Sequence, residues 1–211
     1  MQQPDINEVA EVLAKVLYCG DRELGLCILR LLANGRPISS EQLAVSLGRS
    51  HDEVTVALRQ LPNVEFDRQG EIVGSGLSLL PTSHRFEVNG HMLYTWCALD
   101  TLMYPLILKL PAHVASPCPV TGEQVRLMVM PDGIRNLTPS EAVVSIVLPQ
   151  QAEACRDVRG AFCNQVHFFS SRDGASSWLE QHPTALLLSV DEAFQLGRMV
   201  VLRRYSDVLG G

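Results

Sequence analysis

Two helix-start signals lie close together in the first third of the chain, and they constrain its fold more than any other feature. Ser39-Ser40-Glu41-Gln42 and Ser50-His51-Asp52-Glu53 both place a side-chain acceptor three residues after a serine, the spacing of a capping box. Gly48, between them, favours a tight turn. Apolar residues at helical spacing follow each box: Leu43, Ala44 and Leu47, then Val54, Ala57, Leu58 and Leu61. The pattern predicts two short amphipathic helices joined by a turn.

The flanking residues extend this layout. Asp5 can cap a helix whose apolar stripe ends near Gly20, and a second helix is expected over residues 22–34. Residues 64–80 are expected to form a hairpin that turns at Arg68-Gln69-Gly70. Helices followed by a hairpin are typical of a winged helix. We therefore predict a winged-helix-like N-terminal domain over residues 1–80.

The charge of this region argues against DNA binding. Residues 1–80 carry seven Lys/Arg and eleven Asp/Glu, and the predicted recognition helix over residues 51–61 offers Arg59 as its only strong cation. Such a face is poorly suited to neutralising several phosphates. The net charge of −6 for the whole chain also gives no general attraction to nucleic acid or to an anionic membrane. We expect no nucleic-acid partner.

Residues 81–211 follow a break at Pro81-Thr82-Ser83 and mix strand and helix signals. The expected elements are a hairpin over 84–96 with an Asn-Gly turn, a helix from Cys97 to about Ile107, two strands within 114–130, a strand over 142–148, a helical stretch over 150–160, a strand over 162–169, a helix over 173–181, a strand over 186–190 and a last helix over 191–204. The predicted fold is α+β, with the helical N-terminal part packed on a mostly antiparallel β-sheet core with helices.

The N-terminal residues and the hydropathy predict a soluble cytoplasmic protein with no membrane partner. The N-terminus lacks the basic and apolar regions of a signal peptide, and the longest apolar run, residues 102–110, is too short to span a bilayer. A disulfide framework is therefore not expected among the six cysteines at 19, 27, 97, 118, 155 and 163. Cys19, Cys27 and Cys155 fall on amphipathic helices and need no special role.

The stretch from Leu93 to Asp100 is the strongest candidate for chemistry. If a helix begins near Trp96, Cys97 and Asp100 project from one face at its start, where free N–H groups favour a thiolate. Trp96 and Tyr94 could form an apolar wall. Cys163 lies in the predicted strand, where alternation places it on one face with Gln165 and His167. A plain core role for Cys163, and a hydrogen-bonding role for His167, are the simpler alternatives.

Three stretches carry a family resemblance: Val88 to Leu102, Ser145 to Pro149 and Phe162 to Phe169. Together they closely resemble the organomercurial (alkylmercury) lyase family. The resemblance implies Cys97, Asp100 and Cys163 as catalytic residues, and the same three as ligands of substrate and product mercury. Cys118, between two prolines, matches a cysteine with a mainly structural role. At Asn164 this chain departs from members that have a cysteine there.

The resemblance implies an enzyme that cleaves the carbon–mercury bond of alkyl- and arylmercury compounds by protonolysis, giving a hydrocarbon and Hg(II). No cofactor is expected beyond the substrate's own metal, although cellular thiols are needed for turnover. Mercuric reductase or a small thiol is expected to accept the Hg(II), and the protein to be a monomer or weak homodimer. Hg(II) is a soft ion that prefers thiolates. Asp100 needs an apolar pocket, for which Trp96, Tyr94 and Phe168 are candidates.

Alternatives from other classes remain open at this point. A metal-responsive winged-helix regulator would use Cys97, Cys118 and Cys163 as sensor ligands, and it would need a basic DNA-binding face. A structural zinc site would add His167 to these three cysteines. A cysteine-rich binding module without turnover is the third.

Overall fold

The computed structural model describes residues 5–17, 20–61 and 63–209. The helices of the N-terminal part are α1 (Ile6–Val16), α2 (Arg22–Leu32), α3 (Ser40–Leu47) and α4 (His51–Gln60). Both predicted capping boxes are formed, because the Ser39 and Ser50 side chains accept from the N–H groups of Gln42 and Glu53, whose side chains accept in return. Gly48 ends α3 in the left-handed conformation, with φ of 63°. The helix-start signals at Asp5, Ser39 and Ser50 and the turn at Gly48 are thus confirmed.

The predicted hairpin forms after α4, with antiparallel pairing across the turn at residues 68–70, but its second arm is broken into two strands. The strands are β1 (Glu65–Phe66), β2 (Ile72–Ser75) and β3 (Leu77–Ser78). The chain reverses at Gly76, which has φ of +80°, so that β3 pairs with β2 on one side and with β5 on the other. One long second strand over 71–80 was therefore the wrong prediction. The winged-helix assignment and the domain boundary at residue 80 stay predictions, since one sheet runs through this boundary.

Antiparallel pairing builds the rest of the large sheet. Its further strands are β4 (His84–Val88), β5 (His91–Thr95), β6 (Ala112–Pro117), β7 (Gln124–Met130) and β8 (Gly133–Thr138). Within the described residues the order is β1-β2-β3-β5-β4-β6-β7-β8. The Asn89-Gly90 turn is confirmed, with both residues at positive φ. Strand β8 was missed, because its exposed polar side chains lack an alternating pattern.

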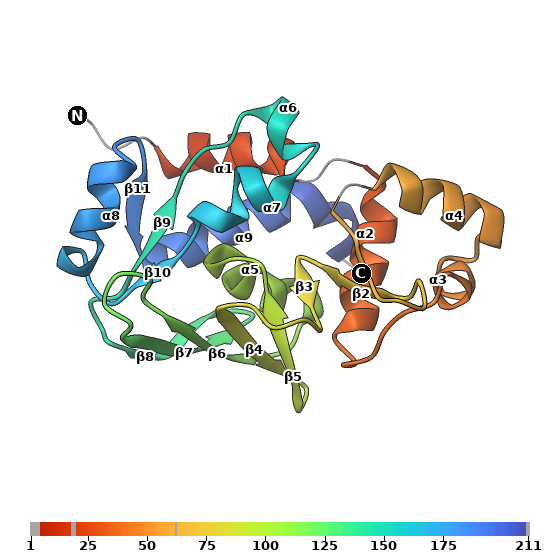
Figure 1. The fold of residues 1–211 in the computed structure, drawn as a ribbon, viewed down its shortest axis with the longest axis horizontal. Coiled ribbons are helices and arrows are strands. Elements are labelled where there is room, and N and C mark those ends of the chain that lie inside the picture. Colours follow the sequence, from red (N-terminus) through yellow and green to blue (C-terminus); the bar gives the residue numbers. More distant parts are fainter. Residues whose placement is uncertain (1–4, 18–19, 62, 210–211) are drawn as a thin grey trace.

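A smaller sheet and the remaining helices complete the α+β fold. They are α5 (Ala98–Leu108), β9 (Val143–Ile146), α6 (Gln151–Ala154), α7 (Val158–Ala161), β10 (Phe168–Phe169), α8 (Ser176–Gln181), β11 (Leu186–Ser189) and α9 (Val190–Leu209). The small sheet has the order β10-β9-β11 and is antiparallel. Helix α5 lies between the large sheet and α9, and α1 packs on α9 (Figure 1). No helix in the described ranges is long and apolar enough to cross a membrane.

The predicted strand over residues 162–169 is mostly wrong. Residues Cys163–Gln165 form a turn of 3-10 helix directly after α7, and Phe168–Phe169 alone pair with β9. Strand pairing here is limited because the Ser145 hydroxyl donates to the Gln165 carbonyl and accepts the His167 N–H. The alternation argument for Cys163, Gln165 and His167 therefore fails. The turn directs Cys163 toward α5 instead.

The cysteines also need one correction. Cys27, Cys97, Cys118 and Cys163 carry free thiols, but Cys155 is in a disulfide. The prediction that no disulfide is expected among the cysteines is therefore wrong at Cys155. Cys19 lies outside the described residues, so its predicted role as a plain helix residue has no structural description.

Candidate active site

Cys97 and Asp100 meet at the first turn of α5. Helix α5 begins at Ala98, and Cys97 is its N-cap residue in extended conformation. The Cys97 N–H donates to the Asp100 carboxylate across 3.2 Å. Thr95 donates to the Cys97 carbonyl across 2.9 Å, which fixes the junction between β5 and α5. The predicted proximity of the thiol and the carboxyl group is confirmed.

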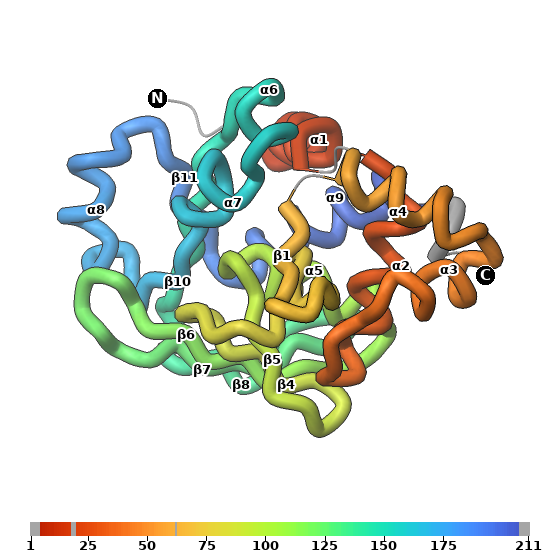
Figure 2. The backbone as a smooth tube through the Cα atoms, turned by 45° about the vertical axis from the view of Figure 1, so that its right-hand side comes forward, coloured from red at the N-terminus to blue at the C-terminus, as the bar shows by residue number. Residues whose placement is uncertain are grey.

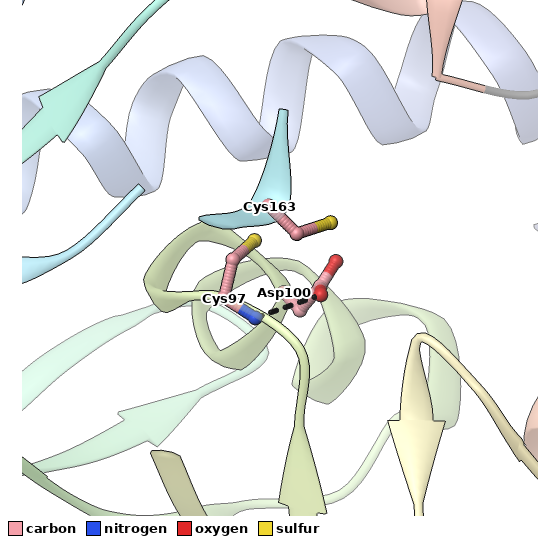
Figure 3. A group of neighbouring side chains, drawn as sticks. All are labelled: Cys97, Asp100 and Cys163. Carbon is pink, nitrogen blue, oxygen red and sulfur yellow. Dashed lines mark hydrogen bonds between the residues drawn. The ribbon is translucent and has the colours of Figure 1, made fainter. Parts of the chain in front are cut away.

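Cys163 reaches the same place from the opposite side. The Ala98 N–H donates to the Val166 carbonyl across 3.1 Å, and this bond holds the 3-10 turn against the start of α5. The sulfur atoms of Cys97 and Cys163 and a carboxylate oxygen of Asp100 all lie within 4.8 Å of one another. In Figure 3 both sulfurs and the second Asp100 oxygen point into the same small volume. One ion could be bound by all three groups.

Burial controls the protonation of this cluster. Cys97 is 0% exposed, and its burial together with the neighbouring Cys163 thiol and Asp100 raises its pKa well above the ordinary value. A hydrogen bond with Cys97 favours the Cys163 thiolate, but burial and Asp100 outweigh it, so the pKa of Cys163 is also raised. The predicted thiolate at a helix start is therefore wrong for the unliganded protein. The dipole of α5 favours the Cys97 thiolate, but complete burial removes the water that would solvate its charge, and burial has the larger effect on the pKa.

Asp100 is the group most easily ionised. Its burial raises the pKa to about 6, although hydrogen bonding by the Cys97 thiol, the Tyr104 hydroxyl and the Cys97 N–H favours the carboxylate. At neutral pH the cluster therefore holds a carboxylate next to two protonated thiols. This arrangement gives Asp100 a proton to take from either sulfur.

A cavity of about 110 Å³ opens on Asp100 and Cys163. Trp96, Met103 and Tyr104 line it from the catalytic side. Trp96 was predicted as a wall residue and is one, whereas Tyr94 and Phe168 are not among the described residues that line the cavity. The side chain of Trp96 is 7% exposed, and its indole N–H has no hydrogen-bond partner within the described residues. A bound molecule with an acceptor atom would satisfy this donor.

The opposite wall comes from both ends of the chain. Helix α2 and its N-terminal approach contribute Asp21, Arg22 and Leu26, and α9 contributes Arg204 and Tyr205. The Arg22 side chain donates to the Arg204 carbonyl across 2.8 Å, which joins the start of α2 to α9 (both labelled in Figure 2). Sequence reasoning missed these residues, because none of them belongs to a motif with Cys97 or Cys163. Tyr104 could have been found, since it follows Asp100 by four residues on a helix.

The segment that carries Cys163 is tied to the N-terminal part. Asn63 accepts the N–H of Val158, the first residue of α7, across 3.2 Å. Arg159 forms an ion pair with Glu65 of β1, and its guanidinium lies 5.4 Å from the centre of the Trp96 ring. The N-terminal part therefore supplies a wall of the cavity and also anchors the helix that precedes Cys163.

Cys118 and His167 lie outside this cluster. Cys118 is buried in a separate apolar cluster with Val143 and Phe169, and its sulfur accepts the Thr121 N–H. His167 stacks against His84 with ring centres 6.5 Å apart. Within the described ranges, Cys97, Asp100 and Cys163 are the one group of three such side chains placed to hold a metal ion. The zinc alternative, which needs Cys118 and His167 in one site, is not supported.

Comparison with known proteins agrees with this geometry. The profile of the alkylmercury lyase family matches residues 77–201, and that of the helix-turn-helix domain of alkylmercury lyase matches residues 11–76. The chain belongs to the alkylmercury lyase family. It is 54% identical to an alkylmercury lyase of Streptomyces lividans over 171 residues, which are 81% of this chain and 78% of the relative.

Other members of the alkylmercury lyase family show the same extent of similarity. An alkylmercury lyase of Staphylococcus epidermidis is 52% identical, over 81% of this chain and 78% of its own. One from Pseudomonas putida is 42% identical, over 87% and 85%. The solved structure of the mercury-bound form of MerB2 is similar with a TM-score of 0.74 and 25% identity, over 94% of this chain and 98% of that one. The regulator alternative is not favoured.

Proposed function

We propose that this protein cleaves the carbon–mercury bond of alkyl- and arylmercury compounds by protonolysis. The observation that carries the proposal is the buried group of two thiols and one carboxyl group, with ligand atoms within 4.8 Å of one another. Sulfur ligands suit the soft Hg(II) ion, and the carboxyl group can supply the proton that a carbon leaving group needs. Membership of the alkylmercury lyase family supports the same reaction.

The first step is thiol exchange. The substrate enters as an organomercury thiolate, and the Cys97 sulfur forms a bond to mercury while the Cys97 proton leaves with the displaced thiol. This exchange does not require a free thiolate in the resting protein, where burial keeps Cys97 protonated. The mercury atom, still bonded to carbon, then lies beside Cys163 and Asp100.

The second step prepares the acid. Cys163 transfers its proton to the Asp100 carboxylate, and its sulfur forms a second bond to mercury. Asp100 can hold this proton because burial raises its pKa to about 6. Two sulfur ligands increase the electron density on the carbon bonded to mercury, so that carbon becomes more basic.

The third step breaks the carbon–mercury bond. Asp100 donates its proton to carbon, the hydrocarbon leaves, and Hg(II) stays between Cys97 and Cys163. The carboxylate is restored, and the proton that arrived with Cys163 has become part of the hydrocarbon. Because Cys97 is 0% exposed and Cys163 is 4% exposed, water has little access to the reacting atoms.

Turnover then requires other thiols to remove the metal. We infer that small cellular thiols or the cysteines of mercuric reductase accept Hg(II) by thiol exchange, the reverse of the first step in chemical type. A cavity of about 110 Å³ admits a small thiol more easily than a protein loop. One free thiol is released from the substrate in the first step, and other free thiols remove Hg(II) after the third step and restore the enzyme.

Release of benzene from phenylmercury in the presence of excess thiol tests the proposal. We expect hydrocarbon in amounts exceeding the protein, and none beyond the blank from Cys97→Ser or Cys163→Ser, because a hydroxyl oxygen is a poor ligand for Hg(II). Cys27→Ser is the matched control, since this free thiol lies on α2 outside the cavity lining. Absence of benzene from the unmodified protein would refute the function.

A further inference from the structure

Tyr104 lies one helical turn after Asp100 and lines the same cavity. Its side chain is 7% exposed, and its ring meets Phe86 edge to face, with ring centres 6.4 Å apart and planes at 89°. Residues four apart on a helix project from one face. The ring is therefore held by packing while its hydroxyl reaches the region of Asp100.

The turn between β2 and β3 leaves space for this hydroxyl. A Cβ atom built on Gly76 would lie 2.0 Å from the Tyr104 oxygen, far inside van der Waals contact. Gly76 also has φ of +80°, so two independent constraints favour glycine here. The Gly76 carbonyl accepts the Trp96 N–H across 2.9 Å. The turn at Gly76 therefore contacts the Tyr104 hydroxyl and also binds the backbone of Trp96, the residue before Cys97.

The Tyr104 hydroxyl lies close enough to the Asp100 carboxyl group to help hold the pKa of Asp100 down by hydrogen bonding. The Cys97 N–H also donates to this carboxylate, at oxygen Oδ2. In Figure 3 the second carboxylate oxygen is directed toward the Cys163 sulfur. We propose that Tyr104 is a positioning residue for the proposed protonolysis, and that its hydroxyl holds the Asp100 carboxyl group facing Cys163 and the mercury atom. The inference rests on the proposed function.

The physical reason is that a carboxyl group turns about two side-chain bonds, and proton transfer to carbon requires one orientation. A misplaced acid loses much of its effect even when it stays in the site. The N–H and thiol donors of Cys97 both come from the junction between β5 and α5, so they hold the carboxyl group from one side only. A donor on a packed ring one turn further along α5 adds an independent constraint on its orientation.

Single-turnover release of benzene from phenylmercury tests this role with Tyr104→Phe, which keeps the ring and removes the donor. Loss of a hydrogen bond to a charged group should slow release about 10- to 100-fold. Binding of one Hg(II) per protein, measured by competition with a small thiol, should stay unchanged and show that the site is folded. Tyr94→Phe is the matched control, because it removes the same hydroxyl group from a tyrosine that does not line the cavity. This variant should keep the original rate of benzene release.

A double-mutant comparison separates positioning from general packing. If Tyr104 acts through Asp100, Tyr104→Phe should slow the original protein but leave the residual rate of Asp100→Asn unchanged. Equal slowing in both backgrounds would overturn the inference, as would an unchanged rate in the single variant. Benzene release by the unmodified protein distinguishes this failure from failure of the proposed function.

Discussion

Replacement of Asp100 by asparagine should stabilise the protein at alkaline pH and not at acidic pH. Burial raises the pKa of Asp100 from an ordinary 3.8 to about 6. The folded protein therefore binds the proton more tightly than the unfolded chain does. As pH rises from about 4 through 6, the folded state must ionise a buried carboxyl group, and stability falls. Asparagine has a similar shape and no charge to bury.

The expected size of this stability difference follows from the pKa of Asp100 in the unfolded chain and in the folded protein. Above pH 6 the cost of the buried charge is roughly 3 kcal/mol, at about 1.36 kcal/mol for each pH unit between 3.8 and 6. It falls to about half of this at pH 5 and to nearly zero at pH 3.5. For a chain of 211 residues, roughly 3 kcal/mol corresponds to an increase of about 6 to 12 °C in Tm.

Denaturant unfolding of both proteins at several pH values measures this difference directly. The free energy of unfolding of Asp100→Asn minus that of the original should grow from pH 3.5 to pH 8 and level off above pH 7. Titrating groups that do not interact with Asp100 contribute equally to both proteins and cancel, and the two neighbouring thiols stay protonated over this pH range because burial raises the pKa of both. A difference that stays constant over this range would refute the reasoning, since it would mean that folding does not change the affinity of Asp100 for its proton.

Further variants test the other parts of the site. Asp100→Ala should keep Hg(II) binding yet slow hydrocarbon release about 10²- to 10⁴-fold, the usual contribution of a positioned acid, as single-turnover kinetics would measure. Cys118→Ser should cost about 1–2 kcal/mol of unfolding free energy in urea at an unchanged rate, because a hydroxyl replaces sulfur in an apolar cluster. His84 is buried, which lowers its pKa to about 3 and makes stability fall as pH drops below 6.5. His84→Gln should remove about 2 kcal/mol of the loss between pH 7 and 5, and an identical acid profile would contradict this. Gly76→Ala should both destabilise the fold and slow release, because the added Cβ meets the Tyr104 oxygen.

The parts of the fold that the sequence predicts well depend on short-range chemistry. The capping boxes at Ser39 and Ser50 and the Asn89-Gly90 turn need only neighbouring residues to form, and all three are present. Cys97 and Asp100 are close for the same reason, because Asp100 follows Cys97 by three positions at the start of a helix. Family resemblance, not periodicity, brought Cys163 into the predicted site.

The errors arise where distant segments decide the outcome. The β-prone residues around Cys163 form a 3-10 turn, because the Ala98 N–H and the Ser145 hydroxyl take up carbonyl groups that a strand would have used. The protonation of Cys97 was also predicted wrongly, since a helix start favours a thiolate only where some water remains. Complete burial is a property of the whole packing, and no local pattern of residues reveals it.

The attachment of α7 to Asn63 and Glu65 has a consequence for any attempt to trim the protein. A fragment starting at residue 81 would retain both reactive sulfurs and the acid, and so would still capture the metal. It would lack the cover that keeps bulk solvent away and the tethers that hold the second sulfur in register with the first. Such a fragment should behave as a scavenger that traps organomercury without releasing hydrocarbon. We therefore expect a cut between β3 and β4, two strands of the same sheet, to separate trapping from bond cleavage.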